Sequence, residues 1–122
     1  MNYFDYEYRV RYADTDKMGI SYYATYFIWF ESVRTEYFRA LELSYTECEK
    51  KGYFLPVVQT GARYHAPSTY DDRLILRTSV GEIRKSSLRF EYLVLNAETN
   101  PQPMVRLGTT DFVGRTAYLF SK

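Results

Sequence analysis

Two acidic side chains lie one residue apart near the start of the chain, directly before a glycine and a run of aromatic residues. The segment reads YADTDKMGISYYATYF from Tyr12 to Phe27, and its acids are Asp14 and Asp16. Aspartates in such a position can brace a turn by accepting backbone N–H groups, hold a metal ion, or act as a general base or nucleophile. The neighbouring residues discriminate among these three uses.

The spacing of oxygen ligands argues against a metal site at the two acids. Residues Asp14–Gly19 begin like a calcium loop of the EF-hand type, which needs an oxygen ligand at its fifth position and an acid at its twelfth. Those positions are Met18 and Thr25 here. A zinc site is expected even less, because the chain contains one histidine and one cysteine. The sequence therefore predicts no metal at this segment.

A structural use and a catalytic use of the acids both remain open on this evidence. The structural use is the commoner one, because aspartate carboxylates often accept N–H groups of nearby loop residues. The catalytic use is favoured by a helix that is expected to begin a few residues later. The free amides and the dipole at its start favour negative charge and can stabilise an oxyanion. An acid beside a helix N-terminus is a minimal apparatus for acyl transfer.

The periodicity of the chain predicts which elements position the acids. Residues 4–12 alternate apolar with charged side chains, which is the pattern of a half-buried strand. Residues 13–19 interrupt this alternation and predict a loop. From about Tyr23 or Ala24 to Leu41, apolar residues recur at helical spacing without Gly or Pro. The acids are therefore expected in a loop that joins a strand to the longest helix.

The rest of the chain is predicted to consist mainly of strands. A capping-box pattern at Ser44–Glu47 predicts a short helix closed by Gly52. Strands are predicted at residues 54–65, with a bend near Gly61, and at 74–82, 87–96, 104–113 and 117–120, the last after a hairpin at 114–115. Consecutive strands with short turns favour an antiparallel sheet, and the long helix must cover one of its faces. The predicted class is α+β, with a curled sheet around a single helix.

Composition and charge exclude several classes of protein. The 122 residues suit one domain, and the net charge of +1 argues against a nucleic-acid-binding protein. The first residues lack the pattern of a signal peptide, and no stretch approaches the ~20 apolar residues of a membrane span. The single cysteine, Cys48, cannot form an internal disulfide and favours a reducing compartment. A soluble, cytoplasmic protein is therefore expected.

The chain is rich in aromatic residues, which make up 19% of it and include fourteen tyrosines. Tyrosine combines apolar area with a polar tip, which suits a core, an oligomer interface or a pocket. The second face of the predicted sheet also carries apolar residues, such as Ile75, Leu93 and Leu95. Because an exposed apolar face usually finds a partner, we expect a dimer or a larger assembly.

Two segments of the chain resemble a known family. RYADTDKMGISYYATYFIWFESVRTEYFR resembles the signature of the 4-hydroxybenzoyl-CoA thioesterase family of hotdog-fold proteins: a strand, Asp-x-Asp-x-x-Gly, a hydrophobic residue, Tyr, and a long aromatic helix that carries Glu. HAPSTYDDRLILRTSVGEIRKSSLRFEY is similar to the family's Pro-x-x-Tyr-Asp-Asp turn and the strands after it. The resemblance covers roughly residues 8–115. It implies the hotdog fold, as one thioesterase domain over residues 1–122, which agrees with the α+β class.

The resemblance implies roles for the residues around the acids. In this family the acid before x-x-Gly acts on an acyl-CoA thioester as nucleophile or general base, which assigns that role to Asp16. The family's oxyanion donor is a backbone N–H at the helix start, here that of Tyr23, where many relatives carry His. A backbone donor does not depend on the side chain, so this role is retained. Asp14 would brace the loop, and Gly19 and Glu31 are possible site residues.

The resemblance also implies a basic cluster that binds the phosphates of CoA. It falls on Arg84 and Lys85 in the segment EIRKSS, with Ser86 in place of a third cation. An ordinary solvated hairpin would have the same composition, so both interpretations of Arg84 and Lys85 stay open.

Three other residues have ordinary interpretations beside the functional ones. Glu31 is either a polar residue that faces the site or an exposed acid that pairs with Arg34 or Thr35 along the helix. His65 is expected to be a strand residue satisfied by its neighbours. Cys48 is expected to be an ordinary buried or half-buried thiol, since the lone histidine is the only imidazole available to activate it.

The leading interpretation is an acyl-CoA thioesterase, which hydrolyses R–CO–S–CoA to a carboxylate and free CoA without a metal or organic cofactor. One alternative is a hotdog protein that binds acyl-CoA or acyl-carrier thioesters without hydrolysing them. A dehydratase on the same fold ranks last, because such enzymes usually pair His with an acid and His65 lies outside the Asp16 motif. The resemblance further implies a homo-oligomer, as a dimer or homotetramer, with the active site at a subunit interface.

Overall fold

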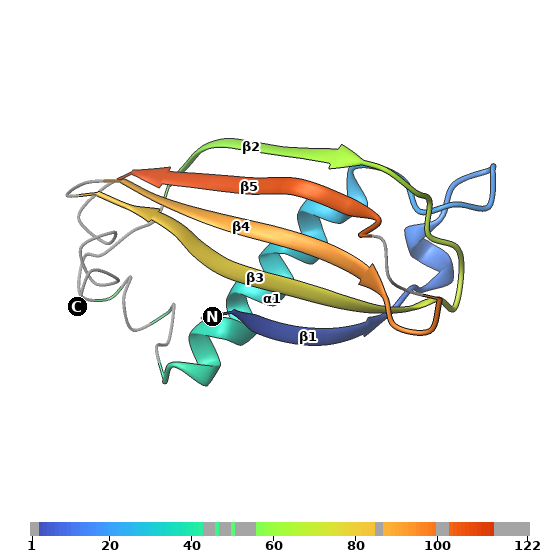
Figure 1. Cartoon of the computed structure of the whole chain (residues 1–122), viewed down its shortest axis with the longest axis horizontal. Helices are drawn as coiled ribbons and strands as arrows, with labels where there is room; N and C mark the ends of the chain where they lie inside the picture. Colours follow the sequence, from blue (N-terminus) through green and yellow to red (C-terminus); the bar gives the residue numbers. More distant parts are fainter. Residues whose placement is uncertain are drawn as a thin grey trace.

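The computed structural model describes residues 3–42, 46, 50, 56–84, 87–99 and 103–113, which form a curled sheet with one long helix across it (Figure 1). The helix is α1 (Thr25–Ala40), and a 3-10 turn, η1 (Tyr12–Asp14), precedes it. The strands are β1 (Phe4–Arg9), β2 (Val57–Tyr64), β3 (Arg73–Ile83), β4 (Ser87–Asn96) and β5 (Val105–Val113). The predicted α+β class, with one helix against an antiparallel sheet, is confirmed.

The order of the strands in the sheet is β1-β3-β4-β5-β2, and all neighbours are antiparallel. β3, β4 and β5 pair in chain order, as short connections favour. β1 and β2 lie at opposite edges, so the segment between them, which includes α1, crosses one face of the sheet (Figure 1). This crossing brings the start of α1 to the end of β2, where the Tyr64 hydroxyl donates to the Tyr23 carbonyl over 2.8 Å.

The core lies between α1 and the inner face of the sheet. α1 buries a stripe of apolar residues at helical spacing, namely Tyr26, Trp29, Phe30, Val33 and Phe38. β3 and β4 contribute alternate residues, namely Leu74, Leu76 and Thr78, and Leu88, Phe90, Tyr92 and Val94. The periodicities of 3.6 and 2 in the sequence therefore mark the buried faces correctly. The helical spacing predicted that the apolar stripe continues through Ala40 and Leu41, and this is wrong for the last turn, where both residues are exposed.

A glycine permits the closest contact between α1 and the sheet. The rings of Phe30 and Tyr92 stack in parallel with their centroids 4.1 Å apart. A Cβ atom at Gly108 would lie 2.9 Å from the Phe30 ring and 3.2 Å from the Tyr92 Cβ atom. Because such distances are well inside van der Waals contact, a side chain at position 108 would displace this stack.

Two predicted strands differ from the structure by more than one residue at an end, and two others differ by one residue. The first strand ends at Arg9 and not at residue 12, because the Asp14 N–H bonds to the Arg11 carbonyl and starts η1. The strand predicted at residues 54–65 is confirmed over β2. Its pairing with β5 shifts in register between Gly61 and Arg63, as the predicted bend requires.

The outer face of the sheet is less apolar than its sequence pattern suggests. Ile75, Leu93 and Leu95 are half-buried and not openly exposed. Cross-strand ion pairs lie on the same sheet, with N–O distances of 2.7 Å for Arg77–Asp5, Arg73–Glu7 and Arg89–Asp111. Long arginine side chains cover apolar neighbours while their guanidinium groups stay near water. Exposed apolar area lies instead on β2, where Val57 and Val58 are 51% and 57% exposed.

Several predictions lie wholly or partly outside the described residues. These are the short helix at 44–52, of which residues 46 and 50 are helical, the hairpin at 114–115, the last strand at 117–120, Cys48 and Lys85. Within the described ranges, no helix combines the length and hydropathy needed to span a membrane.

Candidate functional site

Asp14 ends η1, and Asp16 lies in the loop between η1 and the start of α1, at one end of the sheet (Figure 1). The loop is held by backbone bonds: Asp16 N–H donates to the Ile20 carbonyl over 2.9 Å, and Gly19 N–H donates to the Asp16 carbonyl over 3.0 Å. Gly19 has a φ of 80°, in the left-handed region that favours glycine. The glycine of the motif is therefore explained by backbone conformation, because it closes the turn that begins at Asp16.

Asp14 is buried and its carboxylate is occupied by neighbours. One carboxylate oxygen, Oδ2, accepts the Tyr8 hydroxyl over 2.6 Å and the Arg11 N–H over 2.8 Å. The Arg11 guanidinium lies 3.5 Å from the other oxygen. Burial, followed by the hydrogen bond to Asp14, raises the pKa of the Tyr8 phenol. These contacts tie the end of β1 to η1, which is the bracing role expected of Asp14.

Asp16 has a different environment from Asp14. It is half-buried, and its Oδ1 atom accepts the Met18 N–H over 2.8 Å. Within the described part of the chain, Oδ2 has no hydrogen-bond partner. One oxygen is thus fixed by the turn while the other is available to a water or an acyl carbon. Asp16 does not itself line the nearest pocket, but its N–H is bonded to Ile20, which does.

The first turn before α1 presents an unused backbone amide at Tyr23. The Tyr22 carbonyl of the same peptide group accepts the Thr25 N–H over 2.9 Å, so the orientation of the peptide is fixed. The next carbonyl, that of Tyr23, accepts the Tyr64 hydroxyl and the Tyr26 N–H. No acceptor for the Tyr23 N–H exists among the described residues. A fixed N–H without an acceptor is the arrangement that an oxyanion donor needs.

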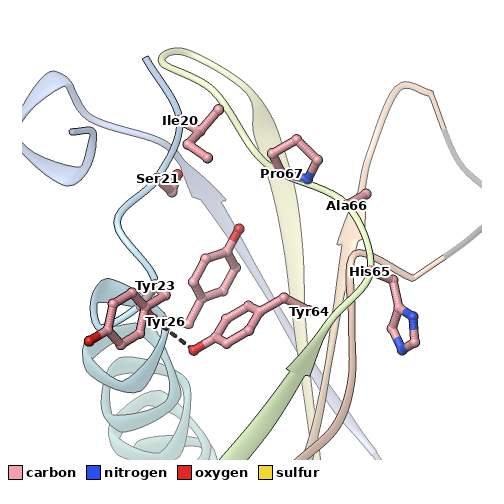
Figure 2. Close-up of a pocket in the computed structure, with 8 residues that line it drawn as sticks. All are labelled: Ile20, Ser21, Tyr23, Tyr26, Tyr64, His65, Ala66 and Pro67. Carbon is pink, nitrogen blue, oxygen red and sulfur yellow. Dashed lines mark hydrogen bonds between the residues drawn. The ribbon is translucent and has the colours of Figure 1, made fainter. Parts of the chain in front are cut away.

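A pocket of about 350 Å³ opens beside this amide (Figure 2). It is lined by Ile20, Ser21, Tyr23, Tyr26, Tyr64, His65, Ala66 and Pro67. The hydroxyl of Tyr23 and the imidazole of His65 point away from it, whereas the rings of Tyr26 and Tyr64 form its wall (Figure 2). Burial raises the pKa of both the Tyr26 and the Tyr64 phenol. The wall is therefore aromatic and uncharged at neutral pH.

Sequence reasoning missed four residues of this region: Ser21, Tyr26, Tyr64 and Ser68. The Ser21 and Ser68 hydroxyls lie 2.6 Å apart, and the Tyr26 and Ser68 hydroxyls lie 2.9 Å apart. These partners are 47 and 42 residues apart in the chain, and no spacing in the sequence relates them. Tyr64 could have been noticed only as an aromatic residue at the end of a strand.

Arg84 lies far from Asp16 in the same chain. The Asp16 loop adjoins the segment just before β3, because Ile20 forms a bridge with Thr69 and the Ser21 N–H donates to the Ser68 carbonyl. Arg84 follows the opposite end of this strand of 11 residues, about 36 Å away at roughly 3.3 Å per residue. It is exposed, with one guanidinium nitrogen 3.3 Å from Glu82. One subunit therefore does not bring Arg84 and Asp16 together, and Lys85 lies outside the described residues.

Glu31 is an exposed residue on α1. Its carbonyl, and not its carboxylate, accepts the Thr35 hydroxyl over 3.0 Å. The predicted pairing of Glu31 with Arg34 is wrong, because the Arg34 guanidinium turns to the sheet. There it donates to the Tyr92 hydroxyl over 2.8 Å and lies 5.1 Å from the centre of the Phe112 ring. Among the described side chains, no three His, Cys, Asp or Glu residues gather as metal ligands would.

Residues 18–101 of the chain match the Thioesterase superfamily. This match begins two residues after Asp16 and so does not test that residue. The Escherichia coli (strain CFT073) acyl-CoA thioester hydrolase YbgC is 34% identical over 90 residues, which are 74% of this chain and 67% of that protein. The Haemophilus influenzae acyl-CoA thioesterase YbgC is 36% identical over 91 residues, again 74% and 67% of the two chains. The chain covers 65% of a third relative, from Bacillus subtilis.

A solved structure agrees with these sequence matches. The DHNA-CoA thioesterase from Staphylococcus aureus superposes with a TM-score of 0.85 at 30% identity, over 93% of this chain and 74% of that chain. The chain therefore belongs to the thioesterase superfamily and has its hotdog fold.

Proposed function

We propose that this protein is an acyl-CoA thioesterase. It would convert R–CO–S–CoA and water to a carboxylate and the free thiol of CoA. The observation that carries the proposal is the Tyr23 peptide group, which is held in a fixed orientation beside an aromatic pocket and whose N–H has no acceptor among the described residues. The thioesterase relatives give the reaction class, and the free oxygen of Asp16 gives a reactive group on the same loop.

The proposed chemistry uses two groups of the chain. The thioester carbonyl accepts the Tyr23 N–H, which stabilises the negative charge that develops on its oxygen. Asp16 then either removes a proton from an attacking water or attacks the acyl carbon itself, with an anhydride as the intermediate that water hydrolyses. In both routes the C–S bond breaks, and the CoA sulfur leaves and takes up a proton. No step requires a metal, so EDTA should leave turnover unchanged.

The pocket is proposed to hold the acyl group. Its aromatic wall suits an aryl or medium-chain acyl group, because such surface is favourably removed from water. Exclusion of water around the carbonyl also strengthens the bond to the Tyr23 N–H. Arg84 and Lys85 would bind the phosphates of CoA from a second subunit, in a cytoplasmic homo-oligomer of two or four chains.

A second candidate function is thioester binding without hydrolysis. One observation favours it: the Asp16 side chain is not among the residues that line the pocket. A binding protein would need the pocket and the amide but no carboxylate at the carbonyl. CoA or acyl-carrier thioesters would both be ligands of such a protein.

A thiol-release assay across a panel of acyl-CoA thioesters separates these two functions. We expect wild type to turn over at least one aryl or medium-chain thioester, and we expect the variant Asp16→Asn to turn over the same thioester much more slowly. Binding of the same thioesters without release of thiol would support the binding protein and contradict the enzyme. Absence of both binding and release would contradict both functions.

A further inference from the structure

Asp14 joins the first strand to the start of α1 through two different parts of the residue. Its side chain, which is 4% exposed, accepts the Tyr8 hydroxyl of β1 over 2.6 Å. Its backbone carbonyl accepts the Tyr22 N–H over 2.9 Å, and the Thr25 hydroxyl lies 3.5 Å from the same oxygen. Asp14 thus ties a strand of the sheet to the turn that presents the Tyr23 N–H.

The two groups proposed to act on the thioester lie on the two arms of a short antiparallel ladder. The ladder begins where the Asp14 carbonyl accepts the Tyr22 N–H, and it continues to the bond between the Asp16 N–H and the Ile20 carbonyl over 2.9 Å. A β-bridge lies between these two contacts. Asp16 belongs to the first arm, and Tyr23 directly follows the second. A shift at the contact between Asp14 and Tyr22 would therefore move the Tyr23 N–H relative to the Asp16 carboxylate.

The Tyr8 hydroxyl is placed to keep the Asp14 side chain in one position. Tyr8 lies opposite Leu74 of β3, so its backbone belongs to the sheet. Its ring packs against the Trp29 ring with a centroid distance of 5.2 Å, and its hydroxyl accepts the Arg11 Nε–H over 3.0 Å. The single proton of this hydroxyl is donated to the Asp14 carboxylate. A short hydrogen bond to a charged acceptor is stronger than one between neutral groups.

We propose that Tyr8 is a positioning residue of the thioesterase reaction. Tyr8 is not among the residues that line the pocket, so it acts through Asp14. Its hydroxyl keeps Asp14 in place, and Asp14 in turn sets the distance between the Tyr23 N–H and the Asp16 carboxylate that one thioester carbonyl requires. Groups that are held in place before the substrate binds lower the barrier more than groups that must be ordered during the reaction. This proposal rests on the proposed function, from which it takes the roles of Asp16 and Tyr23.

The test compares Tyr8→Phe with Tyr6→Phe. Tyr6 lies on the same face of β1 and is also half-buried, but its hydroxyl has no partner among the described residues. Tyr8→Phe should lower kcat for acyl-CoA hydrolysis by about 3- to 10-fold and leave KM within about twofold of wild type, because substrate binding does not use this hydroxyl. Tyr6→Phe should leave both constants unchanged. Rates are measured well below the melting temperature of each variant, so that loss of folded protein does not contribute.

Amide hydrogen exchange shows whether the effect passes through Asp14. The Tyr22 N–H, which bonds to the Asp14 carbonyl, should exchange faster in Tyr8→Phe than in wild type. The increase should be larger than at the amides paired between β3 and β4, which report global unfolding. A variant that had only lost stability would show the same increase at both places.

Two results would overturn the proposal: a kcat for Tyr8→Phe equal to that for Tyr6→Phe, or a lowered kcat without a selective increase in exchange at Tyr22. If a thermal melt shows that Tyr8→Phe does not fold, Arg11→Ala replaces it, because this change removes an exposed guanidinium that orients the Tyr8 hydroxyl. A wild type that releases no thiol would contradict the proposed function. Selective exchange at Tyr22 would then still support the link from Tyr8 to this turn, and its absence would overturn that link too.

Discussion

Asp14 and Asp16 differ in what their oxygens contact, and the different functions that we propose for them rest on this difference. The Asp14 carboxylate accepts hydrogen bonds from the Tyr8 hydroxyl and the Arg11 N–H and lies near the Arg11 guanidinium, and these contacts hold the loop. Asp16 has one oxygen on the Met18 N–H and the other without a partner among the described residues. A base or nucleophile needs such a free oxygen, whereas a bracing residue needs none. Substitution by Asn should therefore mainly lower the rate at Asp16 and mainly lower the stability at Asp14.

Asp16→Asn should lower kcat by at least about a hundredfold, because an amide cannot take a proton at neutral pH and is a poor nucleophile. KM should change little if the contacts with CoA lie elsewhere. The Asn side chain keeps an oxygen for the Met18 N–H, so the melting temperature should stay close to that of wild type. Thiol release and thermal unfolding measure the two effects.

Asp14→Asn is the matched control at the same loop. An amide in place of the buried carboxylate weakens the bonds from Tyr8 and Arg11, so the free energy of unfolding should fall by about 0.5–3 kcal/mol. Its effect on kcat should be smaller than that of Asp16→Asn. If Asp14→Asn abolished turnover with a normal melt while Asp16→Asn stayed active, the two roles would be reversed.

At the scale of elements, the site depends on the position of β2 beside the start of α1. Tyr64 at the end of β2 donates to the Tyr23 carbonyl and packs its ring against Tyr26 with a centroid distance of 5.1 Å. The edge strand thus holds the peptide turn from which the proposed oxyanion donor projects. Gly108 acts similarly at the core, since it lets the Phe30–Tyr92 stack join α1 to the sheet.

Tyr64→Phe should lower kcat while the ring contacts are kept. The lost hydrogen bond is worth about 0.5–1.5 kcal/mol, which corresponds to about 2- to 12-fold if it acts wholly in the transition state. Tyr70→Phe, at a residue 60% exposed and outside the pocket, is the control and should leave kcat unchanged. Equal kcat values for Tyr64→Phe and wild type would show that this bond does not position the Tyr23 amide.

Gly108→Ala should lower the free energy of unfolding by about 1–3 kcal/mol, because the new methyl group overlaps the Phe30 ring. Gly61→Ala is the control, since its nearest contact would be the Thr109 hydroxyl at 3.9 Å. That change should alter stability by less than about 1 kcal/mol. Urea denaturation of the two variants compares them, and equal destabilisation would exclude the Phe30 contact as the cause.

At the scale of the whole molecule, the proposed site is divided between two subunits. Arg84 lies at the far end of β3 from the Asp16 loop of the same chain. If Arg84 binds the phosphates of CoA as we propose, it must therefore serve the Asp16 loop of another subunit. Within the described residues, β2 pairs only with β5 and leaves its outer edge open, with Val57 and Val58 exposed. Open edges with apolar side chains are usually covered by a partner. This surface is where we expect a second copy to bind.

The protein should therefore be a dimer or larger at micromolar concentration, as measured by light scattering. Val58→Lys places a charge on the open edge and should shift the assembly towards monomers. Glu42→Lys, an exposed change away from β2, should not. A wild type that is monomeric yet fully active would contradict both the interface and the shared site.

Arg84→Ala/Lys85→Ala should raise KM for acyl-CoA and leave kcat nearly unchanged, because contacts to phosphate strengthen the ground state and the transition state alike. Salt should mimic the change, since exposed charges are screened within about 10 Å at 0.1 M. Mixed oligomers of this variant with Asp16→Asn should recover activity at low substrate concentration. In such an oligomer, one site combines Asp16 from the first variant with Arg84 and Lys85 from the second. A normal KM for the double variant would show that the phosphates of CoA bind at other residues.

The sequence alone determined the class of fold, because alternation and helical spacing are local properties that directly mark buried faces. The residues of the first motif likewise predicted the loop, the helix start and the family, which the match over residues 18–101 confirms. The proposed roles of Asp16 and Tyr23 came from the same motif and stay predictions. The end of β1 was predicted wrongly. A hydrogen bond between Asp14 and Arg11 ends the strand there, although the apolar pattern continues.

Only the tertiary structure decided which distant residues meet. The strand order puts β2 at the edge beside the start of α1, and this order brings Tyr64 to Tyr23. The loop after β2 brings Ser68 to Ser21 and Tyr26. The same sheet separates Arg84 from Asp16 by the length of β3, although the family resemblance assigned both residues to the binding of one thioester. Periodicity fixes which face a side chain takes within its element, whereas contacts between elements depend on strand order and register, which no local pattern contains.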